Sequence, residues 1–466
     1  MGERGSRDRA NSRQRSVARW SNFMNMKSTY FKDALRTIAN VLKDLGFESS
    51  KTLVIRDLYG RIRVLLDSQP DASKDLKQKL SEQMTQLGRY LPSHDAILDR
   101  GGLLDFETIF NDPSIQNFYL PGTDISIRLL DRQIVGQEWL QPQQPQPGSV
   151  PRLVFYGLKG GVGRSTALAI FAYHLAQKGK RVLLIDFDLE SPGLSSLLLP
   201  AKNRSEFGMV DWFVEDGIGQ GNEILPQMIS SSPIGQYTIG AIRVVAASGV
   251  ETGDEYYLSK LSRAYLSINQ NNKTESFLAR ATRLLTDLEK REKPDVVLID
   301  SRAGLHDLAA ISIVGLSTYA YLFATGSDQS WQGYRLLFSH WRTYPETLKK
   351  IRDRLVMVHA LFPETDQDVR ADRFLENSYT LFSETIYETI EPGENIGTTS
   401  SADYSDRFNF DLRDESAPHF PVRIRWNNSI QEFDPKLLAK NILSDELINA
   451  VFGDLLKRAD LDLEIS

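Results

Sequence analysis

The chain lacks cysteine altogether, and it has only six histidines among its 466 residues. Without cysteine there can be no disulfide, no thiolate metal site and no cysteine nucleophile. The small number of histidines also leaves little material for a histidine-rich metal centre. A cysteine-free chain fits a reducing compartment, so we expect a cytoplasmic protein.

Long apolar runs and an excess of one charge are also missing. No stretch reaches the ~18 consecutive apolar residues that a membrane-spanning helix needs. The net charge is −6, which gives no overall attraction to nucleic acid. With 41% apolar and 25% charged residues, the composition is typical of globular domains, and the length predicts two of them.

A glycine-rich loop is the most informative feature that is present. The segment 159–166 reads KGGVGRST, follows the apolar run 153–156 and precedes a helical pattern that begins at Ser165. Gly160, Gly161 and Gly163 have no Cβ, so successive backbone N–H groups can turn inward onto phosphate oxygens. A strand, a glycine loop and a helix start in this order predict a nucleotide site.

Three side chains of this loop extend the prediction. Ser165 can offer its hydroxyl to a phosphate-bound Mg²⁺, and Thr166 can donate to an inner phosphate. Arg164 stands where the common GxxxxGK[ST] pattern has lysine. A guanidinium can still bridge phosphate oxygens, although its geometry differs from that of an ammonium group.

Two acidic motifs follow downstream. The run 181–186 ends in Asp186 with Asp188 two residues later, and the run 294–299 leads into Asp300. A carboxylate at the carboxyl end of a buried strand beside a phosphate loop commonly holds Mg²⁺, directly or through water. The alternative for each motif alone is an ordinary turn after a strand, but the three together favour a nucleotide site.

The apolar pattern predicts the fold class. Strands are expected at about 152–157, 181–186, 242–246, 295–300, 319–324 and 354–361, separated by helical stretches such as 165–177 and 275–291. Buried strands that alternate with helices indicate an α/β fold with a doubly wound, mainly parallel sheet and its ligand at the carboxyl ends of the strands. All three motifs fall at such ends.

These motifs resemble those of the ParA/MinD group of deviant P-loop ATPases. More narrowly, KGGVGRST, DFDLESPGLS and LIDSRAG are similar to the KGGVGR-motif variant subgroup. The resemblance covers about 151–362, extends more loosely to the C-terminus and leaves out the first 150 residues. It implies a P-loop NTPase fold, ATP and Mg²⁺ as cofactors, and slow ATP hydrolysis.

The resemblance also implies roles for single residues. Lys159 would be the signature lysine that reaches across a homodimer interface, Asp188 would orient the attacking water, and Gly304 would sense the γ-phosphate. The expected catalytic residues are Asp188, Lys159 and Arg164; the expected nucleotide-binding residues are Gly160, Gly161, Val162, Gly163, Arg164, Ser165 and Thr166; and the expected metal-holding residues are Ser165, Asp300 and Asp186.

Two departures from the family pattern leave questions open. Arg164 in place of lysine leaves the rate of hydrolysis undecided. The strand at 354–361 ends without the Asn that reads adenine in many relatives, so ATP is what the resemblance implies and no side chain there supports it.

The remaining sequence predicts the domain organisation. Residues 1–27 form a basic tail with six arginines in its first twenty positions, which is expected to be flexible and is open to nucleic acid or an acidic partner. Residues 28–140 read as a small α+β domain of unknown role, with a helix from about 28 to 45 and a hairpin at 52–66. The Pro/Gln-rich segment 141–149 reads as a semi-rigid linker, and 150–466 as the ATPase.

The C-terminal segment 445–466 bears on membrane binding, because MinD-type relatives anchor through a basic amphipathic helix. Here the segment has an apolar face but six acidic residues against Lys457 and Arg458. An anionic bilayer would repel that surface, so we expect the helix to pack on the ATPase sheet and no membrane partner.

Three functions therefore stay open. The first is a switch ATPase whose nucleotide state controls homodimerisation and the binding of a partner through the N-terminal domain. The second is a non-hydrolysing nucleotide sensor or scaffold in a bacterial signalling or defence system. The third is a tyrosine-kinase-like phosphotransferase, against which the absence of tyrosine from 405–466 counts.

Overall fold

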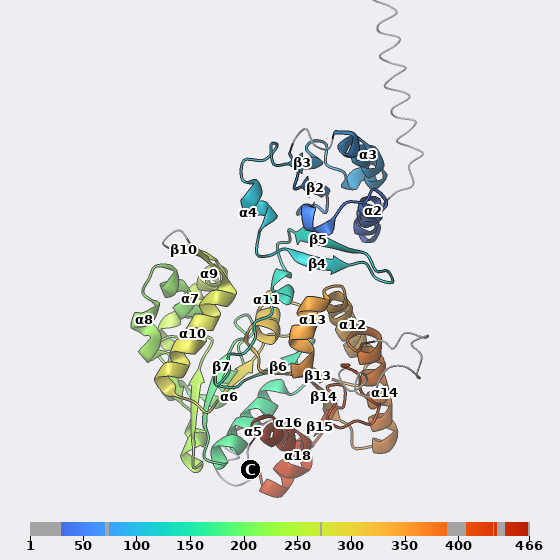
Figure 1. Cartoon of the computed structure of the whole chain (residues 1–466). Coiled ribbons are helices and arrows are strands. Elements are labelled where there is room, and N and C mark those ends of the chain that lie inside the picture. Colours follow the sequence, from blue (N-terminus) through green and yellow to red (C-terminus); the bar gives the residue numbers. More distant parts are fainter. Residues whose placement is uncertain are drawn as a thin grey trace, which may run out of the picture. The chain divides into compact units, whose positions relative to one another are not determined.

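The computed structural model describes residues 29–69, 74–270, 273–388, 407–431, 433–435 and 443–464. The chain divides into two compact units, 1–134 and 135–466 (Figure 1). The basic tail predicted for residues 1–27 lies outside the described residues. Each unit has its own sheet and its own apolar core.

The first unit is built on a five-stranded mixed sheet. The predicted hairpin at 52–66 is present, with Val54 opposite Val64 in an antiparallel pair. Helices α2 (Phe31–Asp44) and α3 (Lys74–Met84) cover one face, and α4 (Phe106–Phe110) covers the other. The strands in spatial order are β3 (Ile97–Asp99), β2 (Ile62–Leu66), β1 (Thr52–Arg56), β5 (Ser126–Asp131) and β4 (Gln116–Tyr119).

The second unit contains an eight-stranded sheet that is parallel except for β8 at one edge. The predicted doubly wound, mainly parallel α/β fold is therefore correct. Each strand expected between 152 and 361 is present within one or two residues. The order is β15 (Val422–Arg425), β14 (Leu355–Phe362), β13 (Tyr319–Ala324), β6 (Arg152–Gly157), β12 (Val296–Asp300), β7 (Arg181–Asp186), β9 (Ala241–Val245) and β8 (Ile229–Ser231).

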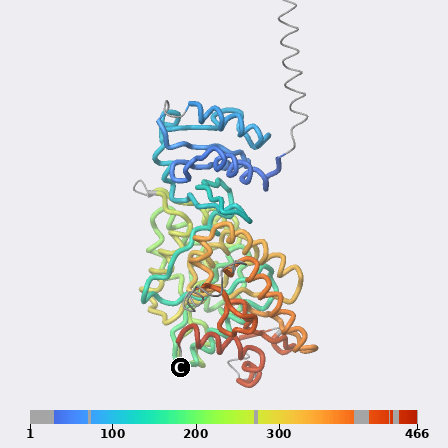
Figure 2. Tube along the Cα trace, turned by 45° about the vertical axis from the view of Figure 1, so that its right-hand side comes forward, coloured from blue at the N-terminus to red at the C-terminus, as the bar shows by residue number. Residues whose placement is uncertain are grey.

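Helices cover both faces of this sheet (Figures 1 and 2). Helix α5 (Arg164–Gln177) and helix α18 (Asp445–Asp462) lie on one face; α10 (Phe277–Glu292), α11 (Asp307–Ala310) and α12 (Asp328–Arg342) lie on the other. Central strand β12 is buried on both sides, which explains its unbroken apolar sequence. The remaining elements are α6 (Leu194–Leu198), α7 (Met209–Gly217), α8 (Gly221–Ile224), α9 (Tyr257–Ala264), α13 (Pro345–Ile351), α14 (Gln367–Thr385), α16 (Asn428–Gln431) and the hairpin β10 (Ile268–Gln270) to β11 (Lys273–Glu275).

Helix α18 packs as its charge pattern predicts. Its apolar residues, such as Val451, Phe452 and Leu455, are buried in the core that also contains α5 and β15. The acidic C-terminal helix thus completes the second unit. Within the part of the chain that the structure describes, no helix combines the length and apolarity needed to span a bilayer.

The start of the segment expected to be a linker is held on the second unit, whereas the side chains of 143–149 are exposed. The boundary between the units falls after Ile134, and a short 3₁₀ helix at Gln137–Leu140 places Trp139 in the core of the second unit. The Gln143 N–H donates to Val314 O at 3.2 Å, and Arg354 donates to Gln143 O at 2.9 Å. Burial of Trp139 and these backbone bonds hold the start of 141–149 on the second unit.

Candidate functional site

The glycine-rich loop joins β6 to α5 at the carboxyl edge of the sheet. Gly161 and Gly163 adopt positive φ angles of 75° and 77°, a conformation that side chains disfavour. A Cβ built on Gly160 or Gly161 would meet no atom within 4 Å, so there is open space beside both residues. Because α5 begins directly behind it, the free N–H groups of the first helical turn face an anion bound there.

The acidic motifs meet beside this loop. Asp186 ends β7 and Asp300 ends β12, and the two residues are paired in the parallel register. The Ser165 hydroxyl donates to Asp300 Oδ2 at 2.6 Å, which ties the start of α5 to β12. Asp186 Oδ2 accepts from the N–H and hydroxyl of Ser195, at 3.1 and 3.0 Å. The three predicted metal-holding residues thus lie in one cluster.

Arg164 sits among these carboxylates rather than at the surface. Its side chain is 8% exposed, with Nη2 3.7 Å from Asp188 Oδ2 and Nε 4.0 Å from Asp300 Oδ1. These separations are those of ion pairs without a close hydrogen bond. Nη1 of the same guanidinium is buried and has no partner. Arg164 therefore balances two acids and keeps a donor unused.

Burial sets the protonation of the cluster. It raises the pKa of Asp186 to about 7, and the neighbouring Asp300 adds to the rise. Burial also raises the pKa of Asp188 and of Asp300, while the Arg164 guanidinium opposes the rise at both. Three carboxyl groups that are costly to ionise together indicate a site suited to a cation.

A magnesium nucleotide fits the unpaired atoms of this cluster. Arg164 Nη1, Asp186 Oδ1 and Asp300 Oδ1 are all buried without a hydrogen-bond partner. Among the described residues, no three His, Cys, Asp or Glu side chains form a ready metal cage. Mg²⁺ commonly takes one or two protein oxygens and completes its shell with phosphate and water, which matches this arrangement.

Lys159 lies apart from the carboxylates. Its side chain is exposed, and its ammonium group donates to Gln329 Oε1 on α12. Gly304 is closer to the loop: its N–H donates to Gly157 O at 3.2 Å, and its carbonyl accepts from the Tyr156 hydroxyl at 3.1 Å. Lys159 thus contacts α12 instead of the carboxylates, and Gly304 contacts the residues just before the loop.

A cavity of about 240 Å³ continues from the loop and shows what sequence reasoning missed. Gly161, Gly163 and Thr166 form one wall, and Trp426 and Asn427 come from the segment after β15. Leu361, with φ of 53°, and residues of α16 and α18 complete the lining.

The strand at 354–361 ends without an Asn. The cavity is nevertheless lined by Asn427, which stands two residues after β15, the strand next to β14. An Asn directly after the β-rich run 420–426 was the signal available in the sequence.

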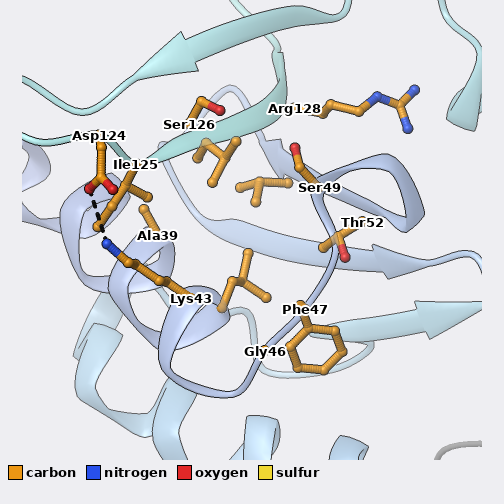
Figure 3. Close-up of a pocket in the computed structure, with 13 residues that line it drawn as sticks. Ala39, Lys43, Gly46, Phe47, Ser49, Thr52, Asp124, Ile125, Ser126 and Arg128 are labelled. Carbon is orange, nitrogen blue, oxygen red and sulfur yellow. Dashed lines mark hydrogen bonds and ion pairs between the residues drawn. The ribbon is translucent and has the colours of Figure 1, made fainter.

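The first unit has a cavity of its own, about 360 Å³, between the C-terminal end of α2 and strands β1 and β5 (Figure 3). Its floor is apolar, and Lys43 Nζ closes one end by pairing with Asp124 Oδ1 at 3.0 Å. The Arg128 guanidinium, on another wall, donates to Phe110 O at 2.7 Å. The charged groups of this cavity thus have protein partners.

Several solved structures are similar to this chain at low sequence identity. A ParA family ATPase from Chlorobium tepidum TLS is 14% identical with a TM-score of 0.40, over 67% of this chain and 99% of that one. MinD cell division protein from Aquifex aeolicus is 15% identical with a TM-score of 0.38, over 66% and 96%. Cobyrinic acid a,c-diamide synthase from Mycobacterium smegmatis, with bound ADP and magnesium, is 19% identical with a TM-score of 0.35, over 49% and 81%.

Comparison with curated protein sequences finds no match. A family model, in contrast, matches residues 153–397, which is more than half of the chain. The matched span contains the glycine loop and both acidic motifs. With that match and the geometry of the site, the chain belongs to the family of the CobQ/CobB/MinD/ParA nucleotide-binding domain.

Proposed function

We propose that the protein is a Mg²⁺-dependent ATP-binding molecular switch that hydrolyses ATP slowly. The observation that carries the proposal is the set of buried, unpaired atoms at the open glycine loop: one donor of Arg164 and one oxygen each of Asp186 and Asp300. Buried polar atoms without partners are uncommon in folded proteins and are expected where a ligand supplies the partner.

The residues divide the work by their chemistry. The loop N–H groups from Gly160 to Gly163 and the start of α5 would hold the phosphates, with Thr166 as a further donor and Val162 packed beneath the loop. Ser165, Asp300 and Asp186 would hold Mg²⁺, which when bound neutralises phosphate charge. Asp188 would orient and polarise the attacking water.

The cavity beside the loop is suited to the base of the nucleotide. Trp426 offers an aromatic surface, and Asn427 offers an amide that can both donate and accept. Asn427 Oδ1 already accepts from the Ser429 N–H at 2.9 Å, so its NH₂ group is oriented by the chain. Trp426 and Asn427 would therefore stack on a base and donate a hydrogen bond to it, and the family resemblance makes adenine the expected base.

Arg164 bears on the rate of hydrolysis. Its guanidinium is always charged, lies 3.7 Å from Asp188 and opposes the rise in the pKa of Asp188 that burial causes. Because proton acceptance by Asp188 would aid the attack, we infer that this pairing makes the reaction slower than burial alone would, while nucleotide binding stays intact.

The switch would act through a homodimer. Lys159 is exposed beside the loop, where a second chain could receive it at its own nucleotide. The dimer would form with ATP and open after hydrolysis, changing what the N-terminal unit binds, which could be a protein or nucleic acid. We place this activity in the cytoplasm.

Light scattering on the purified full chain tests the switch. The mass is measured without nucleotide, with ADP–Mg²⁺ and with ATP–Mg²⁺, for the wild type, for Lys159→Ala and for Lys349→Ala, which removes an exposed lysine on α13. We expect a dimer only with ATP, lost in Lys159→Ala and kept in the control. A monomer throughout, despite measured ATP binding, would contradict the dimer mechanism.

The second candidate is a nucleotide sensor or scaffold without useful turnover, which the pairing of Arg164 with Asp188 favours. Asp188→Ala separates the two functions. A fall in phosphate release supports the ATPase, whereas an unchanged and negligible release supports the sensor.

A further inference from the structure

The loops that follow β7 and β12 are joined by one side chain, Glu190. Its Oε2 pairs with Arg302 Nη1, and its Oε1 lies 3.3 Å from His306 Nε2. Asp188 stands two residues before Glu190, and Asp300 stands two residues before Arg302. The contact therefore connects the two loops immediately beyond their site carboxylates.

The tautomer of His306 determines that it donates a hydrogen bond to Glu190. Its Nδ1 accepts from the Leu308 N–H at 3.2 Å and so caps α11. In neutral imidazole one nitrogen accepts and the other donates, so Nε2 presents its hydrogen to Glu190. Burial and the Arg302 guanidinium lower the pKa of His306, which favours this neutral form. The cap and the contact with Glu190 thus depend on each other.

Helix α9 belongs to the same cluster. The hydroxyl of Tyr265, directly after α9, donates to Glu190 Oε1 at 3.3 Å. The hydroxyl of Tyr257, in its first turn, donates to Leu189 O at 2.5 Å. The loop after β7 is therefore held by α9 on one side and by the loop after β12 on the other.

The path continues from His306 to the boundary between the units. Its neighbour Asp307 accepts from the Gly136 N–H through Oδ1 at 2.6 Å. Gly136 has φ of 95°, a conformation that suits glycine, and it stands two residues after the boundary at Ile134. Trp139 then anchors the segment, because its carbonyl accepts from Trp341 Nε1 at 3.1 Å.

We propose that Glu190, His306 and Asp307 are positioning residues that transmit the nucleotide state from the two carboxylate-bearing loops to segment 135–140, where the N-terminal unit is joined. The inference rests on the proposed nucleotide site and names the segment that responds when a nucleotide binds there. A bound nucleotide that shifts Asp188 and Asp300 also shifts the loops that follow them, which hold Glu190 on one side and Arg302 and His306 on the other. Asp307, at the start of α11, then moves with His306 and alters its hydrogen bond to Gly136.

Two observations show that this path has room to rearrange. Arg302 Nε is buried without a partner, so its guanidinium has a donor that another geometry could satisfy. Glu138 Oε2 is likewise buried and unpaired, in the 3₁₀ helix that follows Gly136. Coupling between two sites requires an element that can adopt two arrangements. A second arrangement that gives these unpaired atoms a hydrogen-bond partner is stabilised by that bond.

Hydrogen exchange on the full chain tests the path. Peptides over 135–140 are followed by mass spectrometry without nucleotide and with ATP–Mg²⁺, while ATP affinity is measured on the same samples by calorimetry. In the wild type we expect nucleotide to change exchange of this segment at least about fivefold, as for one gained or lost hydrogen bond. Glu190→Gln should reduce the change to less than twofold and leave ATP affinity within about twofold.

Asp307→Ala provides the second variant, because it breaks the path at its far end. Glu384→Gln is the matched control, since Glu384 forms a half-exposed ion pair with Arg335 in the same unit. Circular dichroism of each variant establishes that it is folded. The inference is overturned if the wild type binds ATP and 135–140 does not respond, or if both variants respond as the wild type does. Absence of ATP binding in the wild type would instead overturn the proposed function.

Discussion

The charged side chains of the first unit and those of the candidate site in the second unit differ in how completely they are paired. In the first unit, partly buried charges pair with one another, as Arg56 does with Asp131 and Lys77 with Asp99. In the second unit, Arg164, Asp186 and Asp300 keep buried atoms without partners at the edge of the sheet. Within the described residues, every buried side-chain nitrogen or oxygen without a partner belongs to the second unit.

This contrast teaches how to separate structural charges from functional ones. A paired buried charge is satisfied by the fold, and removal of its partner is what costs stability. An unpaired buried charge costs stability, so it persists where a ligand completes it. The glycine loop and the acidic motifs contain unpaired buried charges. In the cavity of the first unit (Figure 3), Lys43 and Asp124 are paired.

Asp188, the residue proposed to orient the attacking water, gives the largest expected difference between a functional charge and a structural one. Asp188→Ala should lower phosphate release at least about 100-fold, the scale of a lost general base, while ATP still binds. Phosphate release and calorimetry on the same protein measure both. Asp366→Ala, on an exposed side chain before α14, is the control. Equal release by the wild type and Asp188→Ala would remove Asp188 from the reaction.

A charge of the first unit should behave in the reverse manner. Arg56 and Asp131 have side chains that are only 12% and 9% exposed, so Arg56→Ala removes the cation from a nearly buried carboxylate, which keeps its hydrogen bond from Gln133. We expect the first unit to lose about 3 kcal/mol of unfolding free energy in urea. The dissociation constant for ATP–Mg²⁺ should not change, and a large change would contradict the separation of roles.

Arg164 tests whether the unpaired donor serves a ligand. Arg164→Ala should weaken ATP–Mg²⁺ binding about tenfold or more, the value of a charge-assisted hydrogen bond. Arg164→Lys should keep most of the affinity and raise phosphate release, because an ammonium lacks the second arm that holds Asp188. Stronger binding by Arg164→Ala would mean that Arg164 blocks the site.

The smallest expected effect concerns Glu138. Burial, with Asp307 nearby, raises the pKa of Glu138 to about 7 from its ordinary 4.5. Between these values the folded chain binds a proton that the unfolded chain does not, so stability falls as pH rises through this window. Glu138→Gln should remove that slope.

Thermal unfolding at pH 5 and pH 8 provides the measurement. We expect the melting temperature of Glu138→Gln, measured relative to that of the wild type, to be about 2 °C higher at pH 8 than at pH 5. A wild-type slope that the substitution leaves unchanged would assign the effect to other groups, such as Asp186, whose pKa burial raises in the same direction.

The sheet and its site were readable in the sequence for a physical reason. Parallel strands buried on both faces need continuous apolar runs, and the motifs at 159–166, 186–188 and 300 stand directly after three adjacent strands. Local pattern therefore determined both the fold class and the cluster of Ser165 with Asp186 and Asp300.

The parts that escaped prediction depend on contacts between distant segments. Asn427 reaches the loop cavity because β15 pairs with β14, a neighbour relation that no local pattern contains. Glu190, His306 and Gly136 meet only when three loops fold together. Segment 141–149 reads as a linker by composition, and the hydrogen bond from Arg354 to Gln143 O, which ties its start to the second unit, appears only in the folded chain.

Calorimetric titration of the full chain with ATP–Mg²⁺, run beside Arg164→Ala and Arg56→Ala, tests the central claim most directly. The account predicts one nucleotide per chain for the wild type, at least about tenfold weaker binding for Arg164→Ala and unchanged binding for Arg56→Ala. Absence of binding by the folded wild type, or equal affinity for wild type and Arg164→Ala, would contradict it.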